Sequence, residues 1–228
     1  MEPVRGSDII QQGFMMLKLH KISFGIRIVT YPRANGLTEK LLKNTISKVF
    51  NQTYKNWTLY LIGDNYGEDL FKIIPAHEKI KVIDAQVDSE RFHKQGKSLM
   101  LCGGINAINH GMDIMERDGV QYYVSLDDDD EWQENHLETL YKGYENFPDA
   151  YFVYTSGFHV RMHKEIPKVD CKLAYNNYPP QAGHTLHSCV SWRLDKIKLR
   201  YIPHHSLYGD EHMWNRMQTL FKEKNWNF

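Results

Sequence analysis

The sequence lacks an excess of charge of either sign. Among its 228 residues, 28 are lysine or arginine and 28 are aspartate or glutamate. A protein that binds nucleic acid through its phosphates needs a positive field, so DNA and RNA are not expected as partners. Long apolar runs are also missing, and none approaches the roughly 18 residues that a membrane-spanning helix requires. We therefore expect no membrane span.

Cysteine is scarce, and the three residues, Cys102, Cys171 and Cys189, lie far apart along the chain. An odd number without any C-x-x-C pair argues against a disulfide framework and against a structural zinc site. The amino-terminal residues also lack the charged stretch, apolar core and cleavage site of a secretory signal. Together these absences favour a cytoplasmic protein.

The hydrophobic pattern alternates between strands and helices in the first part of the chain. This alternation predicts a single Rossmann-like α/β domain with a mixed, mostly parallel central sheet. Residues 1–23 are expected to form an N-terminal extension and residues 24–228 the domain, with Thr38 as the cap of the first helix. The expected strands are 24–31, 57–62, 79–83 and 120–126, and the expected helices are 37–50, 68–74 and 96–115.

The second part of the chain changes pattern after a further helix. Short apolar segments follow one another without helices between them, which is typical of antiparallel strands added to a sheet. A loop rich in turn residues is expected at 167–183. The expected elements are a helix at 134–147, strands at 150–155, 158–163 and 185–192, and a final helix at 210–222.

Four consecutive aspartates, Asp127 to Asp130, follow the strand 120–126 directly. Like charges this close repel one another and need either an opposite charge or full exposure to water. In open α/β sheets, ligands bind beyond the carboxyl ends of the strands. Mg²⁺ and Mn²⁺ prefer carboxylate oxygens together with substrate phosphates, and Asp127 and Asp129 can converge on one ion. From the run alone, a solvated turn without any ligand is an equal alternative.

Three segments resemble glycosyltransferase family 2, of the inverting type with the nucleotide-diphospho-sugar transferase (GT-A) fold. Residues 26–69 resemble its opening strand, T-Y-N-R-like loop, helix ending in Q-T-Y-x-N-W and second strand. Residues 126–140, LDDDDEWQENHLETL, resemble its L-D-x-D-D-x-W pattern. Residues 209–217, GDEHMWNRM, resemble its E-D-x-x-L-W-x-R-L stretch with the two acids in reversed order. Their correct order over residues 24–217 makes the match far more specific than any one motif.

The resemblance implies a metal-dependent transfer of sugar from a nucleotide-diphosphate donor. A UDP-sugar is the commonest such donor, and the acceptor is a hydroxyl of a glycan, lipid or protein. Thr30 and Tyr31 match the loop that holds the nucleotide base, and Asp64 matches the aspartate that hydrogen-bonds it. Lys97 occupies the region of a basic donor contact. Without the resemblance, each of these residues has an ordinary structural role.

The acidic residues receive roles from the same resemblance. Asp127 matches the first aspartate of the D-x-D motif, which lies near the ribose or the metal. Asp128 matches the variable position of the motif, beside the donor. Asp129 matches the ligand of Mn²⁺ or Mg²⁺. The general base that deprotonates the acceptor falls at Glu211, the residue preferred by its place in the pattern, or at Asp210. An acid at a helix start also caps free amides, which is the structural alternative.

Two other functions remain open from the sequence. A sugar-1-phosphate nucleotidyltransferase has a glycine-rich loop with basic residues near the amino end, and residues 30–36 lack it. A non-catalytic domain whose aspartates bind Ca²⁺ or nothing is favoured by the reversed acids, although the run does not match EF-hand spacing. The histidines of the second half match no zinc pattern; they are His184, His187, His204 and His205.

Overall fold

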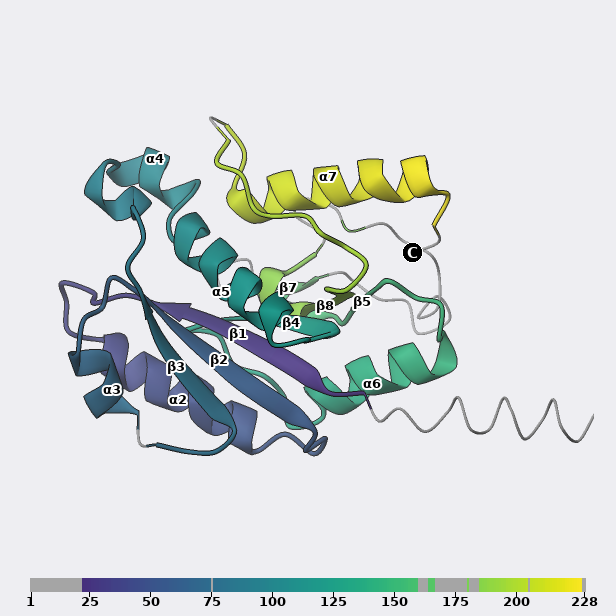
Figure 1. Ribbon diagram of the computed structural model, residues 1–228, viewed down its shortest axis with the longest axis horizontal. Coiled ribbons are helices and arrows are strands. Elements are labelled where there is room, and N and C mark those ends of the chain that lie inside the picture. Colours follow the sequence, from purple (N-terminus) through teal and green to yellow (C-terminus); the bar gives the residue numbers. More distant parts are fainter. Residues whose placement is uncertain are drawn as a thin grey trace, which may run out of the picture.

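The computed structural model describes residues 22–74, 76–159, 164–166, 180, 185–204 and 206–226. A six-stranded sheet with the order β3-β2-β1-β4-β8-β5 runs through the domain, with helices on both faces (Figure 1). Its strands are β1 (Phe24–Thr30), β2 (Trp57–Asp64), β3 (Ile80–Ala85), β4 (Tyr122–Asp127), β5 (Phe152–Tyr154) and β8 (Val190–Arg193). A separate pair joins β6 (Gly157–His159) to β7 (Lys164–Ile166).

The helices connect the parallel strands and cover the sheet. They are α2 (Thr38–Phe50), α3 (Asp69–Ile73), α4 (Gly96–Met100), α5 (Ile105–Arg117), α6 (His136–Asn146) and α7 (Gly209–Lys224), with the 3₁₀ turns η1 (Glu90–Phe92) and η3 (His187–Cys189). Four strands, β3, β2, β1 and β4, are parallel, whereas β8 is antiparallel to β4 and β5 antiparallel to β8. The predicted mixed, mostly parallel α/β sheet is therefore confirmed.

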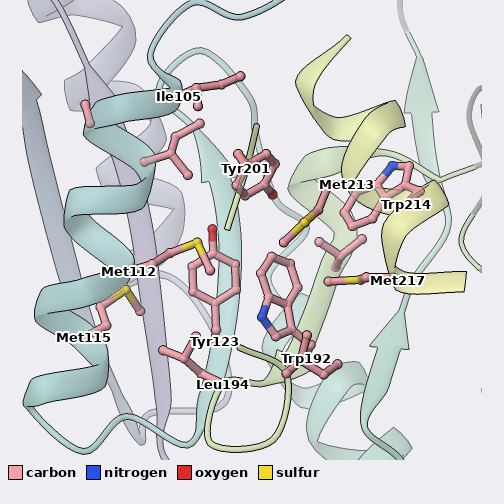
Figure 2. Close-up of a cluster of buried hydrophobic side chains, with 14 of the residues drawn as sticks. Ile105, Met112, Met115, Tyr123, Trp192, Leu194, Tyr201, Met213, Trp214 and Met217 are labelled. Atoms are coloured by element: carbon pink, nitrogen blue, oxygen red, sulfur yellow. The ribbon is translucent and has the colours of Figure 1, made fainter. Parts of the chain in front are cut away.

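Each face of the sheet buries its own hydrophobic core. On one face, α5 and α7 pack over the strands, and their side chains meet around Tyr123 and Trp192 (Figure 2). On the other face, α2, α3 and α6 bury Leu42, Leu70 and Leu137 against β1, β2 and β4 (Figure 1). Because β1, β2 and β4 are buried on both faces, they need helices on both sides of the sheet.

Some predicted elements were wrong in detail. The helix expected at 96–115 is broken into α4 and α5, because Gly104 adopts φ +82°, which ends one helix and starts the next. Thr38 is not the cap of α2: it is the first helical residue, and its hydroxyl donates to the Tyr31 carbonyl. The strand expected at 185–192 begins as the 3₁₀ turn η3.

Parts of the sequence-based prediction fall outside the described residues. These parts are most of the expected extension 1–23, most of the loop 167–183 and the end of the strand expected at 158–163. Among the described residues, Cys102 and Cys189 are buried and unpaired. No helix in the described ranges has the length and apolar character to cross a bilayer.

Candidate active site

A cavity of about 290 Å³ opens at the carboxyl edge of β1 and β4. The loop between α4 and α5 forms one wall, and the first turn of α7 forms another. The pocket brings together several residues singled out from the sequence; they are Tyr31, Asp127, Asp128, Asp129 and Asp210. Thr30, Asp64, Lys97 and Glu211 do not line it.

Asp128 holds the acidic turn to the rest of the protein. Both of its carboxylate oxygens accept hydrogen bonds from the Arg33 guanidinium, at 2.6 and 2.7 Å, and Oδ2 also accepts from the Thr30 hydroxyl at 2.6 Å. Thr45 donates to the backbone carbonyls of Asp128 and Asp130. Asp128 is only 5% exposed. Thr30 and Asp128, both of which were predicted to contact the donor, are hydrogen-bonded to each other.

Asp127 points from the end of β4 toward the pocket and lies beside His187 and Arg27. Its Oδ1 lies 3.0 Å from His187 Nδ1 and 3.9 Å from an Arg27 guanidinium nitrogen. Burial alone raises the pKa of Asp127, but the charge and hydrogen bond of His187 and the charge of Arg27 outweigh it and lower the pKa to about 2. Asp127 is thus held ionised.

Asp129 and Asp130 lack comparable partners. Burial and the neighbouring Asp128 carboxylate raise the pKa of Asp129, and Arg33 only partly offsets them from 3.4 Å. Burial and Asp127 raise the pKa of Asp130 to about 6, although Ser188 donates to it at 2.5 Å. The turn therefore carries more negative charge than the protein neutralises, which is the chemistry that a divalent cation satisfies. No cluster of three or more protein ligands for a metal occurs within the described ranges.

Arg27 is a site residue that sequence reasoning missed. It lies in the middle of β1, is 1% exposed and donates to Tyr123 Oη at 2.9 Å and to Ser125 Oγ. His187 Nε2 lies 3.1 Å from its guanidinium. The signal was a single charge within the apolar segment FGIRIVT, because a buried charge needs partners and marks a polar site.

His187 connects the two halves of the pocket. Its Nδ1 faces Asp127 from η3, while its Nε2 lies 2.7 Å from Tyr201 Oη and 2.9 Å from Ser125 Oγ. Of the other histidines noted from the sequence, His204 contacts neighbouring residues on its own loop. His184 and His205 lie outside the described residues.

Tyr31 and Asp64 are the residues predicted to bind the nucleobase. The Tyr31 ring is flanked by guanidinium groups, with Arg91 Cζ 3.3 Å and Arg33 Cζ 4.7 Å from its centroid. The Asp64 carboxylate is fully buried and accepts from Arg91 Nε and Ser89 Oγ, each at 3.0 Å. Arg91 thus contacts both residues predicted to bind the nucleobase.

Two predicted residues lie apart from the pocket. Lys97 is exposed on α4, and Arg91 is the basic side chain of this region that lines the cavity. Glu211, the preferred general base, accepts a hydrogen bond from the Tyr208 backbone amide at 3.3 Å, which is a helix-capping role. Asp210 lines the pocket, so the geometry favours the other acid of the pair.

Comparison with known proteins identifies the family to which this chain is similar. Residues 26–201 match the family model described as glycosyl transferase family 2. The "Uncharacterized glycosyltransferase R139" of Acanthamoeba polyphaga mimivirus is 38% identical over 215 residues, which cover 88% of this chain and 86% of that protein. The matched residues include the acidic turn and most of the pocket.

A solved structure shares the fold. It is the crystal structure of S. aureus TarS 1-349, with a TM-score of 0.59 and 12% identity. The likeness covers 85% of this chain but only 54% of TarS, so the chain spans about half of that structure. At this identity the likeness concerns the fold alone.

Proposed function

Because this chain belongs to glycosyl transferase family 2, we propose that it transfers a sugar from a nucleotide-diphosphate donor to an acceptor hydroxyl by a metal-dependent, inverting mechanism. A UDP-sugar is the donor to test first. The acceptor is the hydroxyl of a glycan, lipid or protein. The proposed donor site runs from Tyr31 to the acidic turn, and the acceptor enters beside α7.

One observation carries this proposal. A single pocket is lined by Tyr31, by the acidic residues Asp127 and Asp129, and by Asp210 from the far end of the chain. A displacement at the anomeric carbon needs a group that holds the leaving diphosphate and a base on the opposite side of the sugar. Carboxylates from two separate elements that face one cavity supply that arrangement.

The acidic turn fits a divalent cation through Asp127 and Asp129. Asp128 is excluded as a ligand because Arg33 and Thr30 occupy its oxygens. When bound, Mn²⁺ or Mg²⁺ supplies positive charge against the departing diphosphate. The raised pKa of Asp129, whose causes are burial and neighbouring carboxylates, supports such a cation.

The protein's own residues do the remaining work. His187 and Arg27 orient Asp127 and keep it ionised through contacts at 3.0 and 3.9 Å. Asp210 is proposed as the base that accepts the acceptor's proton, with Glu211 holding the first turn of α7 in place. The walls formed by Leu101 and Ile105 restrict water at the reacting atoms.

The proposed location is the cytoplasm. Its support is that Cys102 and Cys189 are buried, unpaired thiols, which persist in a reducing compartment. A sugar-1-phosphate nucleotidyltransferase is the alternative activity, and no observation favours it.

The test is thermal unfolding and calorimetry with UDP, GDP and UDP-sugars, with and without Mn²⁺. We expect a nucleotide to stabilise the wild type only with the metal, because a ligand stabilises the folded state that binds it and the phosphates need a cation to lie beside the acidic turn. Asp129→Ala should abolish this effect. Asp69→Ala, in an exposed pair with Lys72 on α3, is the matched control and should keep it.

Turnover then distinguishes the enzyme from a binding domain. Wild type should release UDP from a UDP-sugar in the presence of acceptor, and Asp210→Asn should bind UDP normally but lose at least about a hundredfold in rate, as expected for a general base. If Glu211→Gln loses more activity than Asp210→Asn, the assignment of the base is reversed. Absence of nucleotide binding under every metal condition contradicts the proposed function.

A further inference from the structure

The aromatic ring expected to stack on a nucleobase, Tyr31, already contacts two guanidinium groups. Arg91 Cζ lies 3.3 Å and Arg33 Cζ 4.7 Å from the Tyr31 ring centroid. Each guanidinium is also paired with a carboxylate at a strand end, Arg33 with Asp128 and Arg91 with Asp64. The ring is therefore engaged by cation–π contacts before any ligand arrives.

Asp64 is occupied in the same way. Its side chain is fully buried, and Oδ2 accepts from both Ser89 Oγ and Arg91 Nε at 3.0 Å. Asn65 Nδ2 lies 3.4 Å from Oδ1. Arg91 therefore holds one oxygen of this carboxylate while its guanidinium lies against the Tyr31 ring.

Of the two arginines, Arg91 is held less firmly. Arg33 forms a two-pronged pair with Asp128, and its side chain is 12% exposed. Both of these hydrogen bonds have to break before Arg33 can leave. Arg91 donates to Asp64 through Nε alone, sits in the three-residue turn η1 and is 24% exposed. Arg91 is thus the group that can leave.

We propose that Arg91 occupies the nucleobase site of the free enzyme and that the base binds by displacing it from Tyr31 and Asp64. This inference rests on the proposed function, since it assigns the base to these two residues. A uracil ring replaces both contacts: its face stacks on Tyr31, and its ring N–H replaces the Arg91 Nε–H at Asp64. The guanidinium already lies near Gly103 and Gly104 at the pocket wall. After displacement it pairs with phosphate there.

The experiment compares uridine with UDP plus Mn²⁺ by calorimetry. Arg91→Ala should bind uridine about tenfold tighter than wild type, because the base no longer competes with a cation–π contact and a charged hydrogen bond. UDP should gain less than uridine, because the wild-type guanidinium interacts with the diphosphate once displaced. Arg91→Lys, which keeps the charge but loses the planar fork, should lie between the two.

Arg193→Ala is the matched control. Arg193 pairs with Asp195 at 2.8 Å and lies 5.0 Å from the Tyr122 ring centroid, so it has the same two kinds of contact away from the pocket. Its removal should leave uridine affinity unchanged. Thermal unfolding of each variant checks that the fold is retained.

A second measurement uses the wild type alone. The Arg91 ¹⁵Nε–H signal, assigned by its loss in Arg91→Lys, should shift when UDP saturates the enzyme. If UDP binds and this signal stays unchanged, or if Arg91→Ala weakens uridine and UDP equally, Arg91 stays in place and the inference is overturned while the proposed function stands. If neither wild type nor Arg91→Ala binds any of these ligands, the proposed function itself fails, and the inference with it.

Discussion

At the scale of single residues, the acidic turn owes its shape to a charge that lies outside it. Arg33 binds Asp128 through two hydrogen bonds of 2.6 and 2.7 Å, and both side chains are almost buried. Asp127 and Asp129 flank the bound residue and line the pocket. One of the four aspartates therefore holds the turn, which leaves the neighbouring acids free to act on a ligand.

Arg33→Gln should lower the free energy of unfolding by about 3 kcal/mol, because it leaves the Asp128 carboxylate buried without its counter-charge. Urea denaturation measures the change. The double variant with Asp128→Asn should lose less than the sum of the single variants, since the buried charge is then gone. Lys43→Gln, from an exposed pair with Glu39, should change stability by about 0.5 kcal/mol or less. Additive effects at Arg33 and Asp128 would contradict the pairing.

His136 gives the protein a pH-dependent stability that is separate from the pocket. Burial lowers its pKa to about 3, and its ring stacks on Trp132 with centroids 4.4 Å apart. In the unfolded state His136 binds a proton near pH 6.5, whereas in the folded state it stays neutral. Its contribution to the free energy of unfolding is therefore fully present above pH 6.5 and declines as the pH falls toward 3. Between pH 7.5 and 5 the loss is about 2 kcal/mol.

The measurement is urea unfolding of wild type and His136→Phe at both pH values. Phenylalanine keeps the stacked ring without a titratable group, so its stability should fall by about 2 kcal/mol less than that of wild type over this range. Carboxylates titrate in both proteins and cancel in the comparison. Equal losses would mean that His136 is protonated in the folded state.

Sequence motifs brought several of the predicted site residues to one place in the fold. Asp127, Asp128, Asp129 and Asp210 belong to such motifs and line the pocket, whereas Glu211, the preferred base, does not. Arg27 was missed, and His187 was noted without a role, because their contacts come from residues distant along the chain: His187 lies 60 residues from Asp127, its partner. Spacing within a sequence carries no information on such pairs.

At the scale of elements, the break between α4 and α5 shapes one wall of the pocket. Gly104 holds φ at +82°, and an added Cβ would meet Val29 at 3.7 Å and Arg91 at 3.9 Å, so space is available but the backbone is strained for any other residue. The periodicity of apolar residues runs across this break, which explains why a continuous helix was predicted. A left-handed glycine cannot be distinguished from a helical one by periodicity alone.

Gly104→Ala should lower stability by about 1 kcal/mol through backbone strain and should weaken nucleotide binding, because the loop lines the pocket. Gly119→Ala is the matched control: Gly119 has φ +77°, open space around its Cα and a position beyond the other end of α5. It should cost similar stability and leave binding unchanged. Thermal unfolding and calorimetry give the two readouts. If both variants bind nucleotide equally well, the loop between α4 and α5 does not contribute to nucleotide binding.

At the scale of the whole molecule, one sheet joins both hydrophobic cores. Tryptophan probes occur on both faces, with Trp57 in the core under α2 and Trp192 and Trp214 in the core under α5 and α7. Unfolding followed by tryptophan fluorescence and by far-ultraviolet circular dichroism should therefore give coincident two-state curves. Two separated transitions would mean that the chain contains two domains.

The mixed sheet was predicted correctly because alternating strand and helix patterns permit few other arrangements. What the sequence did not reveal was the contact between distant halves. The cavity is formed where β1, β4, η3 and α7 meet, and these elements extend from Phe24 to Lys224. Only the packed sheet and its two layers of helices define that meeting point.

Because the pocket residues are spread along the whole chain, they leave the ribosome at different times. The four parallel strands and the acidic turn are complete once residue 130 has left the ribosome, but His187 and Asp210 emerge much later. Domains fold as units during synthesis, and the nascent chain carries the turn before its partners exist. The acids of the turn are thus available early to cations, whereas transfer chemistry waits until the last helix has been translated.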